Sequence, residues 1–397
     1  PNSQAWQREN WMSKLPDDMP VTHVNIPGSH DSSTTKDNMS VVADWTDAWV
    51  QTYTIENQFK MGARYFDFRV GSSLVPCWLG LAERTMTEEE REATPDLKMY
   101  HGPLCTNTSF IGTMRKLAET IMKDRTEFII INVQAERESD GLGNTIYYEI
   151  RQKIFGDGSK DEFYAAVSEQ TTDIANRLLK RFSREYDDEI FIPYSMDLTV
   201  EEARGHIILM ESDQYMHYQC KRYYTTAADG VFHDEDWLRA SFLSGWPDNR
   251  AGFATVYTYS KADSLAKNMY VQSYYEMKLD DKDRISRKEE SIRYLASSVS
   301  GFNANPGHIN VLGFNAMNAN TGSVTGLHTY AFAHEFNGYC YEMYVDNMKN
   351  APASALPFRC GIVPMDHYGA TFFDGDKNIK VYGDKLSWAV IESNFKQ

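Results

Sequence analysis

The sequence predicts an α/β fold, a single (β/α)8-type, TIM-like barrel that is distorted by long loop insertions. Three observations predict it: eight short apolar or β-branched runs, the near-continuous apolar character of these runs, and the helical or irregular stretches between them. Near-continuous apolar runs suit strands that are buried on both faces, and eight such strands with crossover connections make a barrel the leading arrangement. The predicted strands are residues 21–26, 63–69, 97–101, 127–134, 206–211, 268–273, 308–315 and 361–366.

The connections between these strands differ greatly in length, which predicts insertions into one domain. We expect residues 1–397 to form a single barrel domain. The charged segments 159–190 and 280–295 are predicted to be helices with one solvated face. The insertions are expected at about residues 71–96, 137–205 and 213–267.

Composition and charge exclude several classes of protein. A hydrophobic share of 42% is sufficient for a large core. The sequence has no run of 18 apolar residues, so we expect no transmembrane anchor. The net charge of −16 argues against nucleic acid as a partner. The five cysteines are scattered without a CxxC pair, so we expect no structural zinc site and at least one free thiol. The chain begins with Pro1 rather than Met, which favours a processed, secreted protein, and we expect a monomer.

Polar side chains gather where four of the predicted strands end. Active sites of α/β barrels lie at the carboxyl ends of their strands. A single histidine there is more often structural than catalytic, but two histidines with an arginine and several aspartates favour a reaction site. These residues are His30 and Asp31 after the first strand, Asp67 and Arg69 in the second, His101 in the third, and Asp366 and His367 after the eighth. We expect His367 to point to the opposite face from Asp366 and to be structural.

This set of residue types suits the cleavage of a phosphodiester by a neighbouring hydroxyl group. Imidazole titrates near pH ~6.5, so one histidine can act as base and a second as acid at neutral pH. An arginine offers a permanent planar fork to the phosphoryl oxygens, where negative charge builds up in the transition state. Carboxylates can fix the histidine tautomers and stabilise the imidazolium ions that form.

Several segments resemble the X-domain of phosphatidylinositol-specific phospholipases C, and their order and spacing are similar to the bacterial type. The first motifs, taken together, are specific, and the resemblance spans most of the chain. The segments are IPGSHDS at 26–32, RYFDFRV at 64–70, MYHG at 99–102, EFIIINV at 127–133, ARGHIILM at 203–210, YVQSYY at 270–275 and GIVPMD at 361–366.

The resemblance implies a phospholipase C-like phosphodiesterase that releases diacylglycerol and a 1,2-cyclic inositol phosphate. It implies that His30 is the general base for the inositol 2-hydroxyl group and that Asp366 pairs with His30. His101 is implied as the general acid that protonates the diacylglycerol oxygen. The substrate would be a phospholipid at a bilayer surface.

The resemblance also assigns the phosphate-binding group and bears on metal dependence. It implies that Arg69 binds the phosphate, that Asp31 couples Arg69 to the acid, and that Asp67 orients the site. Calcium-dependent relatives place acidic residues at both ends of the strand-two triplet and at the position of Gln134. Here too few carboxylates cluster to supply the 6–8 oxygen ligands that calcium takes. We therefore expect a metal-independent enzyme without a cofactor.

The residues that correspond to the family's head-group pocket differ from the bacterial pattern. Bacterial enzymes hold the inositol hydroxyls with a lysine, an arginine and an aspartate on strands four, five and six. The corresponding substrate-binding candidates here are Gln134, Glu211, Ser273 and the aromatic Tyr275. The departures leave open whether the head group is phosphatidylinositol itself or a modified or glycosylated form.

Two other interpretations stay open from the sequence. One is a barrel phosphodiesterase for another phosphodiester, such as a glycerophosphodiester or a sphingolipid. Those relatives use acidic ligands around a divalent cation, and Arg69 and Gln134 argue against them. The other is a non-catalytic lipid- or sugar-binding module, which would have no need of a paired acid and base. Aromatic residues in segments 76–81 and 237–246 are candidates for insertion into a membrane interface or, alternatively, for packing under a long loop.

Overall fold

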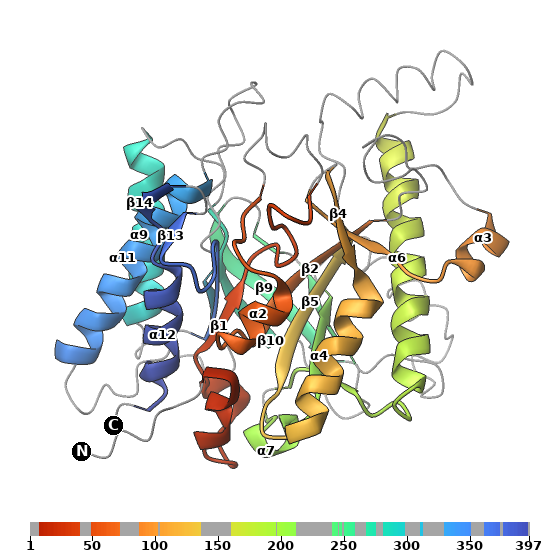
Figure 1. Ribbon diagram of the computed structural model, residues 1–397, viewed down its shortest axis with the longest axis horizontal. Coiled ribbons are helices and arrows are strands. Elements are labelled where there is room, and N and C mark those ends of the chain that lie inside the picture. Colours follow the sequence, from red (N-terminus) through yellow and green to blue (C-terminus); the bar gives the residue numbers. More distant parts are fainter. Residues whose placement is uncertain are drawn as a thin grey trace.

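A central sheet with helices on either side organises the chain (Figure 1). The predicted α/β class is confirmed. No helix among the described residues is both long and apolar enough to cross a bilayer. The computed structural model describes residues 8–39, 49–71, 87–101, 104–135, 160–195, 197–211, 240–244, 246–247, 250–258, 267–274, 281–297, 310–312, 329–350, 361–373 and 376–395.

Nine strands form a pairing path that returns to its starting strand. The path runs from β1 through β12, β11, β10, β9, β8, β7 and β5 to β2, and β2 also pairs with β1. All these pairs are parallel except the two that involve β9. The nine strands are β1 Ile26–Ser29, β2 Tyr65–Gly71, β5 Ile129–Ala135, β7 Ile207–Glu211, β8 Ser241–Ser244, β9 Ala251–Thr258, β10 Lys267–Gln272, β11 Asn310–Leu312 and β12 Ile362–Met365.

The remaining strands extend the edge of this sheet or lie apart from it. A hairpin of β3 and β4 pairs antiparallel with the end of β2, and β6 pairs with β7. A separate two-stranded ribbon follows β12. The bounds are β3 Lys98–His101, β4 Leu104–Ser109, β6 Phe191–Ile192, β13 Phe372–Phe373 and β14 Asp376–Lys380.

The helices lie in two groups beside the strands, with α9, α11 and α12 in one and α4 and α6 in the other (Figure 1). In α4 the side chain of Ser109 caps the first turn by accepting from the N–H of Gly112 at 2.9 Å, and Arg125 ends the helix in a left-handed conformation. The described helices are η1 Arg8–Lys14, η2 Val21–His23, α2 Ile55–Lys60, α3 Glu88–Ala93, α4 Phe110–Asp124, α6 Lys160–Arg184, α7 Val200–Ala203, α9 Lys282–Ser297, α11 Thr329–Asn350 and α12 Gly383–Ser393.

Two hydrophobic cores lie on the two faces of the strands. The inner core contains Tyr65, Ile130 and Met210 and no residue of α4, α6, α9 or α11. The outer core contains Phe66 and Phe68 together with residues of those four helices. Successive side chains of a strand point to opposite faces, so positions in step with Tyr65 face inward. This alternation decides which polar residues meet at the strand ends.

The first predicted strand is displaced along the chain. Residues 21–26 were expected as strand, but Val21–His23 forms a 3-10 turn and the strand continues through Pro27 and Gly28. Proline is tolerated because the ladder between β1 and β2 begins one residue later, at Gly28 and Tyr65. A Cβ atom on Gly28 would lie 2.5 Å from the carbonyl oxygen of Tyr65, so only glycine fits between these strands.

Two other expectations about the strands are wrong. The run 97–101 is a strand, but it forms the antiparallel hairpin beside β2 and is not a member of the parallel set. The expected insertion 213–267 contains β8 and β9, which belong to the main pairing path. Their sequences, SFLS and AGFATVYT, mix serine, threonine and glycine with apolar residues and so differ from the continuous apolar runs that guided the prediction. The helices expected at 159–190 and 280–295 are confirmed as α6 and α9.

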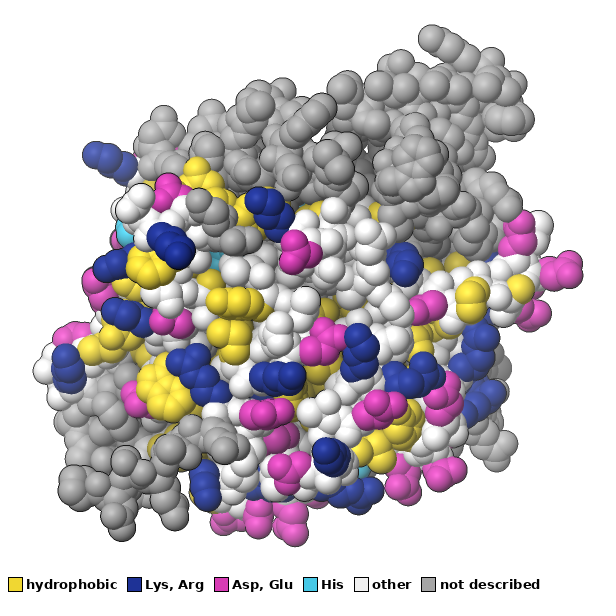
Figure 2. All heavy atoms as spheres, viewed as in Figure 1, with side chains coloured by type: hydrophobic (Ala, Val, Ile, Leu, Met, Phe, Trp, Pro, Cys, Tyr) yellow, Lys and Arg dark blue, Asp and Glu magenta, His cyan; other side chains and the backbone are white. Residues whose placement is uncertain are grey.

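The surface that Figure 2 shows carries basic and acidic side chains side by side. Neither sign forms a broad patch over the described residues of this face. Long-range attraction to a uniformly charged partner is therefore not favoured on this side of the molecule.

Candidate active site

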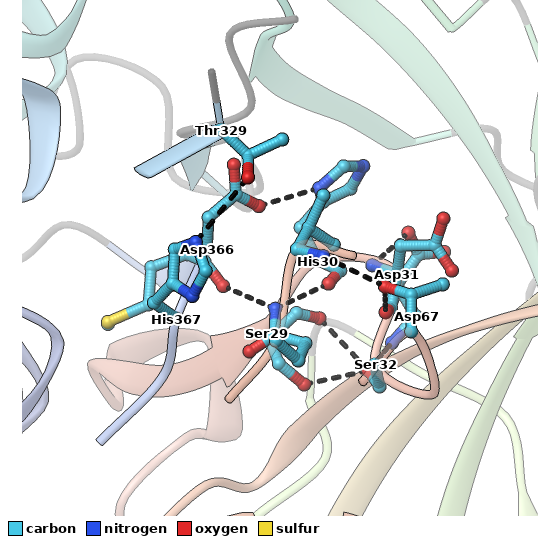
Figure 3. Close-up of polar contacts among 12 residues, drawn as sticks. Ser29, His30, Asp31, Ser32, Asp67, Thr329, Asp366 and His367 are labelled. Carbon is cyan, nitrogen blue, oxygen red and sulfur yellow. Dashed lines mark hydrogen bonds and ion pairs between the residues drawn. The ribbon is translucent and has the colours of Figure 1, made fainter. Parts of the chain in front are cut away.

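Three neighbouring strands bring polar side chains to one level at their carboxyl ends (Figure 3). Strand β1 lies between β12 and β2, with Ser29 paired to Met365 on one side and to Phe66 on the other. The next residue of each strand is therefore His30, Asp366 or Asp67. All three belong to the inward-facing series of their strands, so their side chains converge.

His30 is hydrogen-bonded through both ring nitrogens and is only 3% exposed. Its Nδ1 lies 2.8 Å from Oδ1 of Asp366, and its Nε2 lies 2.7 Å from a terminal nitrogen of Arg69. A guanidinium group can only donate, so Nε2 must accept and the ring proton must reside on Nδ1. The lone pair of Nε2 therefore points to Arg69 and is the basic position of this histidine.

Asp67 and Asp31 hold Arg69 from two directions. Oδ2 of Asp67 accepts from Nε of Arg69 at 3.1 Å and from the backbone N–H of Asp31 at 3.0 Å. A terminal nitrogen of Arg69 lies 3.7 Å from Oδ2 of Asp31. Asp31 has a positive φ of 42°, a conformation that aspartate adopts more readily than most residues. This turn sends the carboxylate of Asp31 toward Arg69 directly after His30.

His101 completes the group from the β3–β4 hairpin. Its Nε2 lies 3.7 Å from Oδ2 of Asp31, the same oxygen that faces Arg69, and the residue is 6% exposed. Asp31 therefore lies between His101 and Arg69. The structure brings all six predicted catalytic residues together, although the hairpin that supplies His101 is not the parallel strand that was expected.

Three buried polar side chains, which the sequence did not single out, fix the positions of these strand ends. Ser32 Oγ accepts from the N–H of Asp67 at 2.8 Å, and Gln51 Nε2 donates to the carbonyl of His30 at 2.6 Å. From α11, Nδ2 of Asn337 donates to the carbonyl of Asp366 at 2.9 Å. Ser32 ends the segment IPGSHDS but was given no role there, and Gln51 and Asn337 lie in no pattern that distinguishes them from ordinary surface residues.

Burial shifts the proton affinities of the group toward uncharged forms. Burial lowers the pKa of His30 to about 3 and that of His101 to about 3, and the Arg69 cation acts in the same direction. Burial raises the pKa of Asp366 to about 7, against the opposing influence of His367, Lys288 and Arg69. In the free protein both imidazoles are therefore neutral at pH 7. An anion bound beside Arg69 would raise the pKa of both.

His367 lies on the other side of Asp366 from His30 (Figure 3). Its Nδ1 is 3.1 Å from the hydroxyl of Thr52 and its Nε2 is 3.5 Å from that of Thr329. Its ring also meets the ring of Trp49 edge-on. These contacts anchor the segment after β12 and leave Asp366 facing His30.

The four substrate-binding candidates are placed differently. Gln134 pairs in register with Arg69 on the neighbouring strand, so it lies beside Arg69 at the edge of the group. Ser273 lies two residues after the inward-facing Val271 and so on the same face, and its Oγ accepts from Nε1 of Trp246 at 3.3 Å. Glu211 is in step with Leu209 of the outer core, so the structure does not bring it into the group. Tyr275 lies outside the described residues.

The proposed membrane-inserting aromatics can be assessed at one position. Trp246 is half-buried, packs against the inner core and donates to Ser273, which favours the packing interpretation for this residue. Residues 76–81 and Trp237 lie outside the described residues. Among the residues that the structure describes, no three His, Cys, Asp or Glu side chains form a metal-binding cluster.

The described elements have the fold of bacterial phosphatidylinositol-specific phospholipases C. A single-residue mutant of the Staphylococcus aureus enzyme matches with a TM-score of 0.58 and 20% identity over 100% of both chains. The Listeria monocytogenes enzyme matches with a TM-score of 0.55 and 16% identity over 98% of this chain and 99% of the other.

Sequence comparison finds relatives with the corresponding names. The 1-phosphatidylinositol phosphodiesterase of Listeria monocytogenes is 26% identical over 205 residues, which is 52% of this chain and 49% of the relative. The protein of that name from Staphylococcus aureus is 48% identical over 63 residues, or 15% of this chain and 19% of the relative. The chain thus spans half the length, or less, of these two relatives. No protein-family model matches the chain.

Proposed function

We propose that this chain is a phospholipase C-like phosphodiesterase of the X-domain type that cleaves phosphatidylinositol or a related inositol phospholipid. One observation carries the proposal: His30 is held between Asp366 and Arg69, and His101 faces the same arginine across Asp31. The strand path that returns to β1 also supports a distorted (β/α)8-type barrel. The names and folds of the bacterial relatives agree with this function.

The first chemical step would form a cyclic phosphodiester. Nε2 of His30 takes the proton from a ring hydroxyl, and that oxygen attacks the adjacent phosphorus. Arg69 moves its hydrogen bond from His30 to the phosphoryl oxygens, where charge accumulates. The imidazolium ion that forms on His30 is stabilised by the carboxylate of Asp366, which already accepts from Nδ1.

The same step would release diacylglycerol. As the bond from phosphorus to the glycerol oxygen breaks, His101 donates its proton to that oxygen and becomes neutral. Asp31 lies close enough to favour the protonated form of His101 when substrate is bound. Protons balance, because His30 gains one and His101 loses one, and solvent exchange restores both.

The chemistry would need no metal ion. The guanidinium group of Arg69 supplies the positive charge beside the phosphate, and Asp67 and Asp31 hold it in place. Gln134, the neighbour of Arg69 on β5, is neutral, so the carboxylate that a calcium site would need there is missing. We further propose that the protein is secreted and works as a monomer on phospholipid at a bilayer surface.

Phosphorus NMR with phosphatidylinositol vesicles in excess EDTA tests the proposal. The protein should produce a cyclic phosphodiester signal, and the His30→Ala variant should be slower by about 10²–10⁴-fold. Turnover that appears only after calcium is added would show that Arg69 has been misinterpreted. Turnover of a glycerophosphodiester or a sphingolipid instead would identify another phosphodiesterase, and binding without turnover would identify a lipid-binding module.

A further inference from the structure

The side-chain amide of Gln51 lies between the ends of β1 and β12. Its Nε2 donates to the carbonyl of His30 at 2.6 Å and to the carbonyl of Met365 at 3.0 Å. Its Oε1 accepts from the N–H of Tyr368 at 3.0 Å, and the residue is inaccessible to solvent. Both amide N–H groups and the amide oxygen are therefore used within the protein. The amide fits in one orientation, because its oxygen would otherwise face two carbonyl oxygens.

The backbone around Gln51 also joins the two strand ends. The N–H groups of Val50 and Gln51 both donate to the carbonyl of Thr34, in the loop after β1, at 3.1 and 3.0 Å. The carbonyl of Val50 accepts from the N–H of His367, which follows β12, at 2.7 Å. This segment is therefore held from both strands, which gives the side-chain amide a defined position.

The two carbonyls that the amide binds lie where the ladder between β1 and β12 ends. The last pair of this ladder is Ser29 with Met365, and the N–H of His30 donates to the carbonyl of Met365 at 3.2 Å. His30 and Asp366 are the residues directly beyond that pair, and their side chains bond at 2.8 Å. Gln51 binds the carbonyl of the first and the carbonyl that precedes the second. It thereby fixes the separation of the two main chains at this point.

The bond between His30 and Asp366 depends on that separation. A hydrogen bond of this kind spans only about 2.7–3.2 Å between its heavy atoms. A relative shift of the two main chains by about 1 Å would break the bond or turn the imidazole ring, and such misplacement of a reacting group is costly in rate. Nε2 of His30, the basic position, would move with the ring.

We propose that Gln51 is a positioning residue for the reaction, whose amide ties the main chain of His30 to β12 and so keeps the imidazole ring against Asp366. The role in turnover rests on the proposed function, whereas the effect on the bond between His30 and Asp366 does not. Because Gln51 is inaccessible to solvent, it acts through His30 and without contact to the substrate.

The amino end of β1 offers a matched control. There Oδ1 of Asn394 accepts from the N–H of Asn25 at 2.8 Å, and its Nδ2 donates to the carbonyl of Asn25 at 2.9 Å. Asn394 is thus another buried carboxamide that binds the main chain beside β1. Gln51→Met and Asn394→Leu each replace the amide by an apolar group of similar size, so both should lower the urea midpoint of unfolding. Gln51→Met alone should affect His30.

Kinetics with phosphatidylinositol in detergent micelles test the role in turnover. Gln51→Met should lower kcat about 10²-fold and change KM by less than about twofold, because the base is misplaced while the groups that contact substrate remain. Asn394→Leu should keep the native kcat. Gln51→Met combined with His30→Ala should be no slower than His30→Ala alone, since the amide acts through that ring. A native kcat in Gln51→Met, an equal loss in Asn394→Leu, or a further loss in the double variant would overturn the proposal.

Proton NMR tests the bond between His30 and Asp366 without any turnover. A ring N–H that donates to a carboxylate gives a strongly downfield signal, which is assigned to His30 by its absence in His30→Ala. The native protein and Asn394→Leu should show this signal, and Gln51→Met should move it upfield or lose it through exchange with water. An unchanged signal in Gln51→Met would refute the effect on the bond.

Two further outcomes have a defined meaning. If the signal changes in Gln51→Met but the native protein does not cleave phosphatidylinositol, the effect on the bond holds and only the proposed function is rejected. If Gln51→Met does not fold, Gln51→Asn keeps the amide on a side chain that is one methylene shorter and should lose at least one of the two bonds to carbonyls. It should then show the lower kcat and the moved signal, and native values of both would overturn the proposal.

Discussion

Two arginines at opposite ends of β2, one fully buried and one half-buried, show how differently the chain uses the same residue type. Arg64 directly precedes the strand and is fully buried, with an N–O distance of 2.7 Å to Glu127. It also donates to the carbonyls of Phe59 and Ala63 at 2.9 and 2.8 Å. Arg69, five residues later, lies among the strand ends with its side chain 17% exposed.

The two arginines differ in how completely the carboxylates around them are hydrogen-bonded. At the amino end, Glu127 accepts from Arg64 and also from the backbone N–H groups of Met12 and Ser13. At the carboxyl end, Oδ1 of Asp67 and Oδ2 of Asp366 are buried without hydrogen-bond partners in the described part of the chain. Open buried acceptors cost stability. The amino-end cluster therefore serves the fold, and the carboxyl-end cluster retains capacity for a ligand.

Removing each of these arginines in turn is the strongest test of the comparison. Arg69→Met should lower kcat/KM about 10³-fold, because charge on the phosphoryl oxygens is no longer stabilised, with little change in unfolding free energy. Arg64→Met should lower the unfolding free energy by about 3–5 kcal/mol, because Glu127 is left as an unpaired buried charge. Urea titration and kinetics on the folded fraction measure the two effects.

The two variants control for one another, since each removes one guanidinium group, at the amino end of β2 in Arg64→Met and near its carboxyl end in Arg69→Met. If Arg69→Met destabilised the chain as much as Arg64→Met, the carboxyl-end cluster would be structural. A large loss of kcat/KM in folded Arg64→Met would likewise contradict the structural role of the amino-end cluster.

His101 offers a second test of the carboxyl-end cluster. If that cluster is catalytic, His101 must donate a proton to the substrate. His101→Ala should lower turnover of phosphatidylinositol about 10²-fold, since the glycerol oxygen then leaves without a proton. A synthetic inositol phosphodiester with a nitrophenol leaving group needs no acid, so His101→Ala should cleave it at nearly the native rate. His30→Ala should remain slow on both substrates, and equal loss on both by His101→Ala would exclude the acid role.

The sequence predicted which residues meet at the carboxyl end because these residues can be recognised from their immediate neighbours in the chain. His30, Asp31, Asp67 and Arg69 lie in or directly after apolar runs, and the ends of neighbouring parallel strands must meet. His101 was placed correctly although its strand was assigned the wrong pairing, because the short hairpin returns it to the same place.

Other features could not be predicted from local pattern. Lys288 lies in a helix whose charged sequence indicates a solvated face, and only the packing of α9 on α11 reveals that this one lysine is buried. Ser32, Gln51 and Asn337 act through backbone groups distant in sequence. Glu211 is in step with the outer face, and the sequence could not show this because a shift of one residue along a strand moves a side chain to the other face.

The smallest predicted effect concerns stability and pH at the carboxyl end. Burial lowers the pKa of His367 to about 4, against about 6.5 in an unfolded chain. A lowered histidine pKa means that the unfolded state binds more protons between these values. The resulting stabilisation is complete above pH 6.5 and is lost as the pH falls toward 4. Asp366, with its raised pKa, acts in the opposite direction, but it is present in both proteins to be compared.

His367→Phe removes this titration while an aromatic ring still fills the space beside Trp49. Between pH 7 and pH 5 the native protein should lose about 2 kcal/mol more unfolding free energy than the variant. The hydroxyls of Thr52 and Thr329 lose their contact with His367 in the variant at every pH, although Thr329 still donates to the carbonyl of Trp49. This loss lowers the unfolding free energy of the variant equally at both pH values. Chemical unfolding at both pH values measures the difference, and parallel curves would show that His367 does not contribute to the pH dependence. A slope shared by both curves would then come from groups that both proteins keep, among which are His30 and His101, the two histidines that the proposed reaction uses.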